Sequence, residues 1–176
     1  EGLGLSMSEV LQKYQQQLLE TFGGSTSEHA GEVTVILPVE KIQEAAQLIH
    51  TQLGFDYLVC VTAVDYWPEE NPRFHVVYIF RSHSQKLTLH VRVPVPGINP
   101  SVLSLTPVYR NANWQEREVY DMFGIKFEGH PDLRRILMPA DWVGHPQRKD
   151  YPLGYEEPQY SFNFDEIKAR KPAPKE

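Results

Sequence analysis

The distribution of proline divides this chain of 176 residues into two parts. Eleven of its 14 prolines lie in residues 94–176. Proline has no backbone N–H and holds φ fixed, so it interrupts both helices and strands. We therefore expect most of the regular secondary structure before residue 94, and extended chain with turns over much of the remainder.

Apolar periodicity predicts the elements of the first part. Residues 8–22 and 39–53 carry apolar side chains at spacings of three and four, which is typical of helices with one buried face. Apolar runs predict strands at residues 33–37, 57–64, 74–80 and 86–93. The continuous run 57–64 is interpreted as a central strand covered on both faces. Together these elements indicate an α+β fold, with a mostly antiparallel sheet packed with helices and then an extended proline-rich C-terminal docking region.

One further helix is predicted at residues 114–123. Asn113 can cap its start, Glu116 would complete a capping box, and Gly124 follows its last turn. Arg117 and Asp121 lie four residues apart on this helix, so we expect them to face one another. The chain is accordingly divided into an α+β core domain at residues 1–124, a charged contact region at 125–150 and an extended arm at 151–176.

The overall composition excludes several functions. A net charge of −6 argues against nucleic acid as a partner, and no apolar run approaches the ~18 residues that direct membrane insertion needs. The single cysteine, Cys60, is interpreted as a small buried side chain. It cannot form a disulfide within the chain or supply the four thiolates of an iron–sulfur cluster. Since glycine-rich nucleotide motifs are absent as well, we expect no catalytic, cofactor-binding or metal-binding residue on this chain.

Residues 116–150 are dense in charge, with six basic and seven acidic side chains interleaved with apolar ones. Burying an unpaired charge costs several kcal/mol, so charges placed in this way tend to be paired. We interpret the segment as a buried network or an interface rather than a solvated surface. The candidate partner-binding residues here are Glu116, Arg117, Asp121, His130, Arg134, Arg135, Arg148, Lys149 and Asp150.

A metal site in a stand-alone enzyme is the rival interpretation, with His130 and His145 as ligands. These histidines lie 15 residues apart in proline-rich chain, without the close spacing that sets two ligands on one face. Histidines that precede prolines in turns more often bond to the backbone, and we expect the same of these two.

The last stretch, Tyr151–Glu176, is too polar to form a core but carries five aromatic residues up to Phe164. Free tails are poor in aromatic residues, so we expect residues 151–164 to lie on another surface and residues 169–176 to stay loose. Tyr155, Tyr160 and Phe162 join the candidate partner-binding residues on this ground.

Five stretches of this chain, in the same order and at similar spacing, resemble the signature of the C subunit of the proton-translocating NADH-quinone oxidoreductases, or respiratory complex I. They are EREVYDMFGI at 116–125, GHP at 129–131, RRILMP at 134–139, DWVGHP at 141–146 and RKDYP at 148–152. Gln147 departs from the family, in which an apolar residue is expected between the last two stretches.

The resemblance implies a cofactor-free assembly subunit of the hydrophilic arm, which supports electron transfer from NADH to quinone. FMN and iron–sulfur clusters would lie on other subunits. The implied partners are chiefly the D subunit, which helps to enclose the quinone cavity, and also the B subunit. The implied location is peripheral, on the cytoplasmic face of the bacterial inner membrane or the matrix side in mitochondria. An alternative within the same superfamily is the equivalent subunit of a membrane-bound hydrogenase or a ferredoxin:quinone reductase.

Overall fold

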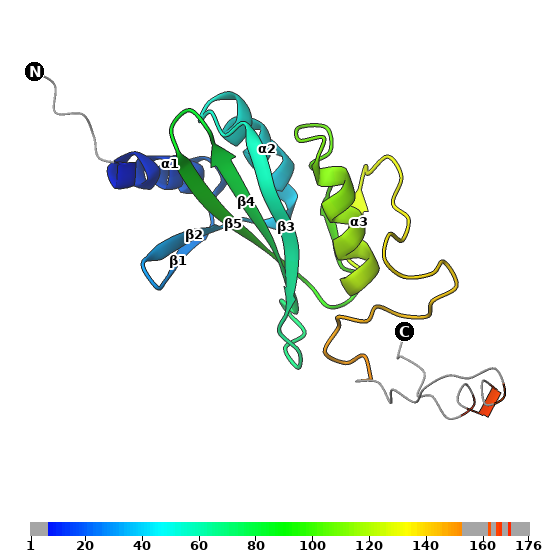
Figure 1. Ribbon diagram of the computed structural model, residues 1–176. Coiled ribbons are helices and arrows are strands. Elements are labelled where there is room, and N and C mark those ends of the chain that lie inside the picture. The colour runs from blue at the N-terminus through cyan, green and yellow to red at the C-terminus, as the bar shows by residue number, and fades with distance from the viewer. Residues whose placement is uncertain (1–6, 153–161, 163–164, 167–168, 170–176) are drawn as a thin grey trace, which may run out of the picture.

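The computed structural model describes residues 7–152 together with residues 162, 165, 166 and 169 (Figure 1). These residues form an α+β fold, in which a twisted five-stranded sheet is packed with helices and a two-stranded sheet lies beside the last helix (Figure 1). The predicted fold class is therefore confirmed, while the predicted C-terminal docking region remains a prediction.

The five-stranded sheet has the strand order β1-β2-β5-β4-β3. Its strands are β1 (Ser25–His29), β2 (Glu32–Ile36), β3 (Tyr57–Asp65), β4 (Phe74–Ser82) and β5 (Leu87–Val95). Neighbouring strands are antiparallel except β2 and β5, which run parallel. The β1 strand was not predicted, because its polar residues are all exposed and leave no apolar alternation to detect.

The helices agree with the predicted ones to within a few residues. They are α1 (Met7–Phe22), α2 (Ile42–Thr51), which a 3-10 turn at Val39–Lys41 precedes, and α3 (Ala112–Phe123). Two short parallel strands, β6 (Ser101–Leu103) and β7 (Lys126–Glu128), flank α3 in the sequence and form the second sheet.

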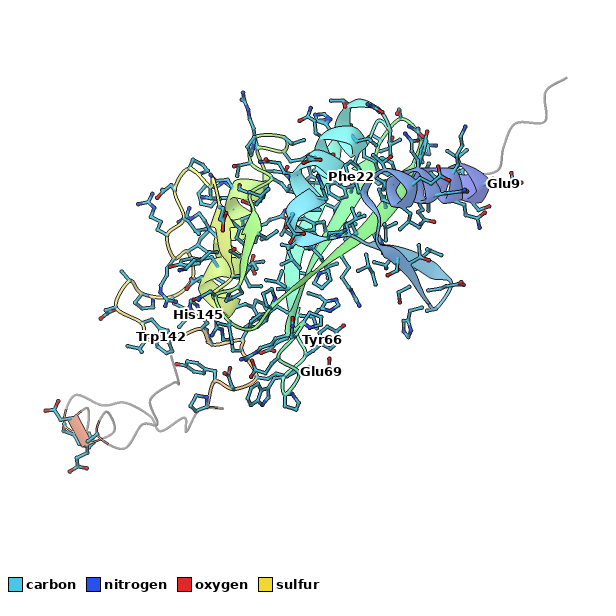
Figure 2. All side chains as sticks on the ribbon, turned by 180° about the vertical axis from the view of Figure 1, so that it is seen from behind. Glu9, Phe22, Tyr66, Glu69, Trp142 and His145 are labelled. Carbon is cyan, nitrogen blue, oxygen red and sulfur yellow. The ribbon has the colours of Figure 1, made fainter. Side chains whose placement is uncertain are left out.

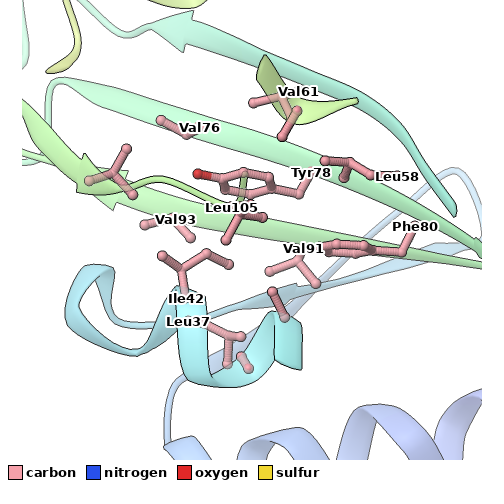
Figure 3. Close-up of a cluster of buried hydrophobic side chains, with 14 of the residues drawn as sticks. Leu37, Ile42, Leu58, Val61, Val76, Tyr78, Phe80, Val91, Val93 and Leu105 are labelled. Carbon is pink, nitrogen blue, oxygen red and sulfur yellow. The ribbon is translucent and has the colours of Figure 1, made fainter. Parts of the chain in front are cut away.

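The hydrophobic core lies against one face of the large sheet, which we call the inner face. Alternate residues of β4 and β5 are buried there, and Figure 3 shows Ile42 of α2 beneath Val93. Burying one such side chain contributes about 1.5–3 kcal/mol, so this face supplies most of the stability of the fold. The core also continues past residue 124, since Ile125 and Phe127 are buried in it.

The prediction that residues 57–64 form a central strand was wrong, because β3 lies at one edge of the sheet. Cys60 is accordingly half-buried rather than enclosed. The edge is covered by α3, whose Gln115 amide accepts a bond from the Val61 N–H and donates one to the Val59 carbonyl. A side chain thus occupies the backbone groups that an exposed edge would offer to another strand.

Candidate subunit-contact site

After β7 the chain folds back past α3 along residues 129–152, which we call the return segment. Figure 2 shows Trp142 and His145 of this segment at the same end of the molecule as Tyr66 and Glu69, which lie between β3 and β4. The return segment contains no helix or strand of its own. Its position therefore depends on contacts with the domain, chiefly those of Asp121, of the C-terminal end of α3 and of Arg73.

Asp121 of α3 holds the first part of the return segment. One oxygen of this fully buried carboxylate accepts bonds from three consecutive backbone N–H groups, those of Ile136 at 3.1 Å, Leu137 at 2.8 Å and Met138 at 2.8 Å. The other oxygen pairs with Arg135 at 2.6 Å. Burial raises the pKa of Asp121, but these bonds outweigh it and keep that pKa below its ordinary value. Asp121 is thus a charged anchor around which the segment turns.

The second set of contacts lies at the C-terminal end of α3, where the last carbonyls of a helix lack partners within it. Three groups of the return segment bond to these backbone carbonyl oxygens. His145 Nδ1 lies 3.0 Å from the carbonyl oxygen of Asp121, the Gln147 N–H donates to that of Met122 at 3.0 Å, and Arg148 Nε donates to that of Phe123 at 2.6 Å. Gly124 ends the helix with a φ of 74°, as predicted. The Arg148 cation also lies at the negative end of the helix dipole, where positive charge is favoured.

The third set of contacts ties the end of the return segment to the sheet. Arg73, which is 4% exposed, pairs with Asp65 at 2.9 Å and with Asp150 at 2.6 Å. The Lys149 N–H donates to Asp65 as well, at 2.8 Å. The bond from Arg73 lowers the pKa of Asp150, and the bond to Asp65 raises the pKa of Arg73 above its ordinary value. The Arg73 guanidinium also lies 4.8 Å from the centroid of the Phe74 ring, so charge and packing act together here.

The predicted pairing of Arg117 with Asp121 was wrong, because the return segment engages both side chains instead. Arg117 donates to the carbonyls of Arg134 at 3.1 Å and Arg135 at 3.2 Å. Its guanidinium lies 5.2 Å from the centroid of the exposed Trp114 ring. The interpretation of these charges as a buried network is nevertheless confirmed, since Asp121 is fully buried and Arg117 is 9% exposed.

The predicted capping box of Asn113 and Glu116 does not form, because α3 begins at Ala112. The Glu116 carboxylate instead accepts bonds from Ser104 Oγ and the Leu105 N–H, both at 2.6 Å. Burial raises the pKa of Glu116 to about 7, although these two bonds act to lower it. Glu116 and Asp121 are both fully buried, so in this conformation they act within the chain and have no exposed surface to offer a partner.

The other predicted contact residues differ in exposure. Arg134 and Lys149 are exposed, and Arg134 pairs with Asp132 on the surface at 2.9 Å. Four more are half-buried, namely His130, Arg135, Arg148 and Asp150. Tyr155 and Tyr160 lie outside the described residues, and Phe162 is 83% exposed.

His130 and His145 lie close to backbone carbonyls, as predicted for histidines in turns. Nε2 of His130 is 3.1 Å from the backbone carbonyl oxygen of Asn113, and Nδ1 of His145 is 3.0 Å from the backbone carbonyl oxygen of Asp121. Those two carbonyls are eight residues apart on α3, or about 12 Å, so the two histidines do not converge on one metal ion. In the described part of the chain, no three His, Cys, Asp or Glu side chains form a possible metal site, and no helix is long and apolar enough to cross a membrane.

Several large apolar side chains are exposed around these internal contacts. Trp114 is 64% exposed, Leu137 61% and Val143 58%. Val143 also lines a groove of about 640 Å³ between the return segment and the loop after β5, where Ile98 is exposed on the other side. Single exposed apolar residues are common, whereas larger exposed apolar patches mark contact surfaces. Leu137 and Val143 lie on the return segment, and Trp114 lies on α3. We call Trp114, Leu137 and Val143 the apolar contact residues.

Asp65 and Arg73 were missed by the analysis of the sequence. The only available signal was that Asp65 is the single charged residue of an otherwise uncharged strand, which indicates a buried partner. Arg73 stands in a loop between Pro72 and Phe74, and no local pattern identifies it as that partner.

Comparisons with known proteins agree on one family. The model of the family described as "Respiratory-chain NADH dehydrogenase, 30 Kd subunit" matches residues 35–157. A protein named as the C subunit of NADH-quinone oxidoreductase, from Roseiflexus sp. (strain RS-1), is 44% identical over 176 residues, which cover 99% of this chain and 100% of that protein. The protein of the same name from Geobacter sulfurreducens is 46% identical over 140 residues, which cover 78% of this chain and 86% of that one.

Two solved structures share the fold. A trypsin-resistant fragment (1-134) of Nqo5 superposes with a TM-score of 0.61 at 35% identity, and covers 70% of this chain and 99% of that chain. A chain of the membrane-bound sulfane sulfur reductase, an archaeal respiratory membrane complex, superposes with a TM-score of 0.63 at 22% identity, and covers 81% of this chain and 85% of that one. At the lower identity the likeness concerns the fold alone.

Proposed function

Since this chain belongs to the 30 kDa subunit family of respiratory-chain NADH dehydrogenase and is a subunit of an NADH-quinone oxidoreductase, we propose that it is a cofactor-free assembly subunit of that complex. It would hold neighbouring subunits of the hydrophilic arm in place and so support the transfer of electrons from NADH to quinone. FMN and the iron–sulfur clusters would lie on those neighbours.

The observation that carries this proposal is the way the return segment is held. Its charged contacts, centred on Asp121 and Arg73, are satisfied within the chain at 2.6–3.1 Å. Arg73 and Asp150 also line the groove of about 640 Å³, but there they pair with each other, and the Asp121 carboxylate bonds to Arg135 and to backbone N–H groups. The network therefore serves to fix an irregular segment with the side chains of Leu137 and Val143 turned outward.

The D subunit of the complex is the proposed main partner, and the B subunit is a second one. The apolar contact residues would form the centre of the contact, and the exposed charges of Arg134 and Lys149 would lie at its rim. Such an arrangement, with apolar and aromatic anchors surrounded by charge, is typical of protein interfaces. We further propose that this chain is peripheral, on the cytoplasmic face of the bacterial inner membrane or the corresponding matrix side.

Two alternatives can be separated from this proposal. The equivalent subunit of a membrane-bound hydrogenase or ferredoxin:quinone reductase would share the fold, but the similar proteins at 44–46% identity are named for NADH and quinone. The electron donor that the purified native complex accepts distinguishes the two. A stand-alone metal enzyme using His130 and His145 would contain stoichiometric zinc or iron in the purified chain, and elemental analysis tests for it.

Substitution of the apolar contact residues tests the assembly function. Leu137→Asp and Val143→Asp place a charge on exposed positions that make no internal side-chain bond, so the fold should tolerate them. Each should reduce the amount of this chain that co-purifies with the complex at least several-fold, because an apolar anchor would be replaced by an unpaired buried charge.

Met7→Asp is the matched control. Met7 is 60% exposed, similar to Leu137, but it lies in the first turn of α1 at the opposite end of the molecule (Figure 1). This variant should co-purify with the complex normally. Normal recovery and normal NADH:quinone activity of the Leu137→Asp and Val143→Asp complexes would refute the proposed contact surface.

A further inference from the structure

The large sheet has a second face, on the side away from α2, and at Thr88 and His90 this face lines a groove together with residues of α1. Along β4 and β5 every second residue is fully buried, and the residues between them are only half-buried. We call the half-buried side the outer face. The residues that matter for its chemistry are Val64, His75, Val77, Ile79, His90 and Arg92.

The register of the strands places an arginine in the middle of apolar neighbours on this face. Arg92 of β5 lies directly opposite Val77 of β4 on one side and Ile36 of β2 on the other. In the next row Ile79 lies opposite both Cys60 and His90. The result is a strip of aliphatic side chains with a cation at its centre.

Arg92 has no acidic partner among the described residues. Its guanidinium donates one bond to the Tyr66 hydroxyl at 3.3 Å, while its Nε is buried and has no hydrogen-bond partner. His75, beside Val77 on the same strand, likewise has a buried Nδ1 without a partner. Burial and the charge of Arg92 both hold the pKa of His75 below its ordinary value. Of these two residues, Arg92 is therefore the one that keeps its positive charge. An arginine in such surroundings is stabilised by a carboxylate.

The basic character of this face is opposite to that of the whole chain. His75, Arg81, His90 and Arg92 share the outer face. The carboxylates near them are that of Glu32, 3.5 Å from His90, and that of Glu69, whose charge acts on His75. The chain as a whole carries a net charge of −6. A partner that fits the face therefore brings apolar side chains and at least one carboxylate.

The dimensions and the edge of the sheet restrict the form of that partner. Three strands at about 4.8 Å spacing present a face about 14 Å wide, which accommodates one helix of about 10–12 Å diameter. Addition of a strand at the β3 edge is blocked, because Gln115 already bonds to the backbone of Val59 and Val61. The partner must then approach the face and not the edge.

We propose that the outer face is a second docking surface, which receives an amphipathic helix of another subunit whose carboxylate pairs with Arg92. The inference rests on the proposed function in one respect, namely that the partner is another subunit of the complex. It adds an interface on the opposite side of the sheet from α2, separate from the return segment.

Zero-length cross-linking tests the pairing directly. Arg92→Lys keeps the positive charge and supplies an amine that a carbodiimide can join to a carboxylate in contact with it. In the purified complex we expect an amide bond from position 92 to an Asp or Glu of another subunit, identified by mass spectrometry and absent from the Arg92→Gln complex. A bond only to Glu32 or Glu69 of the same chain, or to a second copy of this chain, would overturn the proposal.

Thiol labelling provides a measurement that does not alter Arg92. Thr62 is exposed on the outer face opposite Val77, so Thr62→Cys in a Cys60→Ala background places one thiol there. Maleimide should label it at least tenfold more slowly in the complex than in the free full-length chain. Equal rates in a complex that retains this chain would overturn this inference alone, whereas failure of the unmodified chain to co-purify with any partner would refute the proposed function.

Discussion

Replacing Asp121 by Asn should release the return segment without changing the shape of the side chain. The substitution removes the negative charge that pairs with Arg135 at 2.6 Å. It also turns one of two acceptor oxygens into a donor that faces other donors, because the carboxylate oxygens receive only Arg135 and the N–H groups of residues 136–138. Arg135 would keep its bond to the Gly144 carbonyl but lose its counter-charge.

The magnitude follows from the burial of the pair. Asp121 is fully buried and the Arg135 side chain is 17% exposed, so removing one partner leaves a charge in poorly hydrated surroundings. Breaking a buried pair in this way costs about 3–5 kcal/mol. That is a large part of the roughly 5–15 kcal/mol that stabilises a typical domain. A local loss of about 3 kcal/mol corresponds to an increase of about 100-fold in the opening equilibrium of the segment.

Amide hydrogen exchange of the full-length chain measures this effect at the residues concerned. The N–H groups of Ile136, Leu137 and Met138 should exchange about 100-fold faster in the Asp121→Asn variant. Asp132→Asn is the matched control, since Asp132 pairs with Arg134 on the surface with 54% and 72% of the side chains exposed. Exposed pairs contribute about 0–1 kcal/mol. If the two variants show the same exchange and the same denaturation midpoint, the view of Asp121 as an anchor is refuted.

Three further predictions concern other parts of the chain. Burial raises the pKa of Glu116 in the folded state to about 7 from an ordinary value of 4.5. The contribution of Glu116 to the free energy of unfolding is therefore complete below pH 4.5 and is lost as the pH rises to 7. The stability of the wild type relative to Glu116→Gln, measured by urea denaturation, should therefore fall by up to about 3 kcal/mol over that range. Gly124→Ala should destabilise the chain more than Gly129→Ala. Both sites have positive φ, but only at Gly124 would a Cβ lie 2.5 Å from His145 and 2.6 Å from Arg148. Equal thermal denaturation midpoints of the two variants would contradict this. Deleting residues 169–176 should leave the chain in the complex, whereas deleting 151–176 should release it because five aromatic residues are lost, and co-purification distinguishes the two.

The regular elements could be predicted from the sequence because their signals are local. Apolar spacing located α1, α2, β4 and β5, since one face of each is buried in the core. The same reasoning failed for β3, because a continuous apolar run is typical of a strand covered on both faces. In the structure its outer side chains are instead half-buried or exposed on an open face.

The burial of charged residues in the segment 116–150 could be predicted in part, but their bonding partners could not. The charge-dense segment indicated a buried network, and Asp121 and Arg117 belong to it. Their partners were missed because local spacing favoured an Arg117–Asp121 pair, whereas the backbone groups of residues 134–138 provide better-placed partners for both. Arg73 joins Asp65 and Asp150, the latter 77 residues away, and such a contact leaves no trace in sequence spacing.

The capping of α3 by residues 145–148 has a consequence during synthesis of the chain. The helix leaves the ribosome more than twenty residues before the groups that satisfy its last carbonyls. At roughly 5–20 residues per second, this interval lasts on the order of one to several seconds. During that time the final turn of α3 is open to water and the apolar contact residues are not yet fixed in place. The return segment of a nascent chain therefore reaches its final position only after translation has passed Asp150.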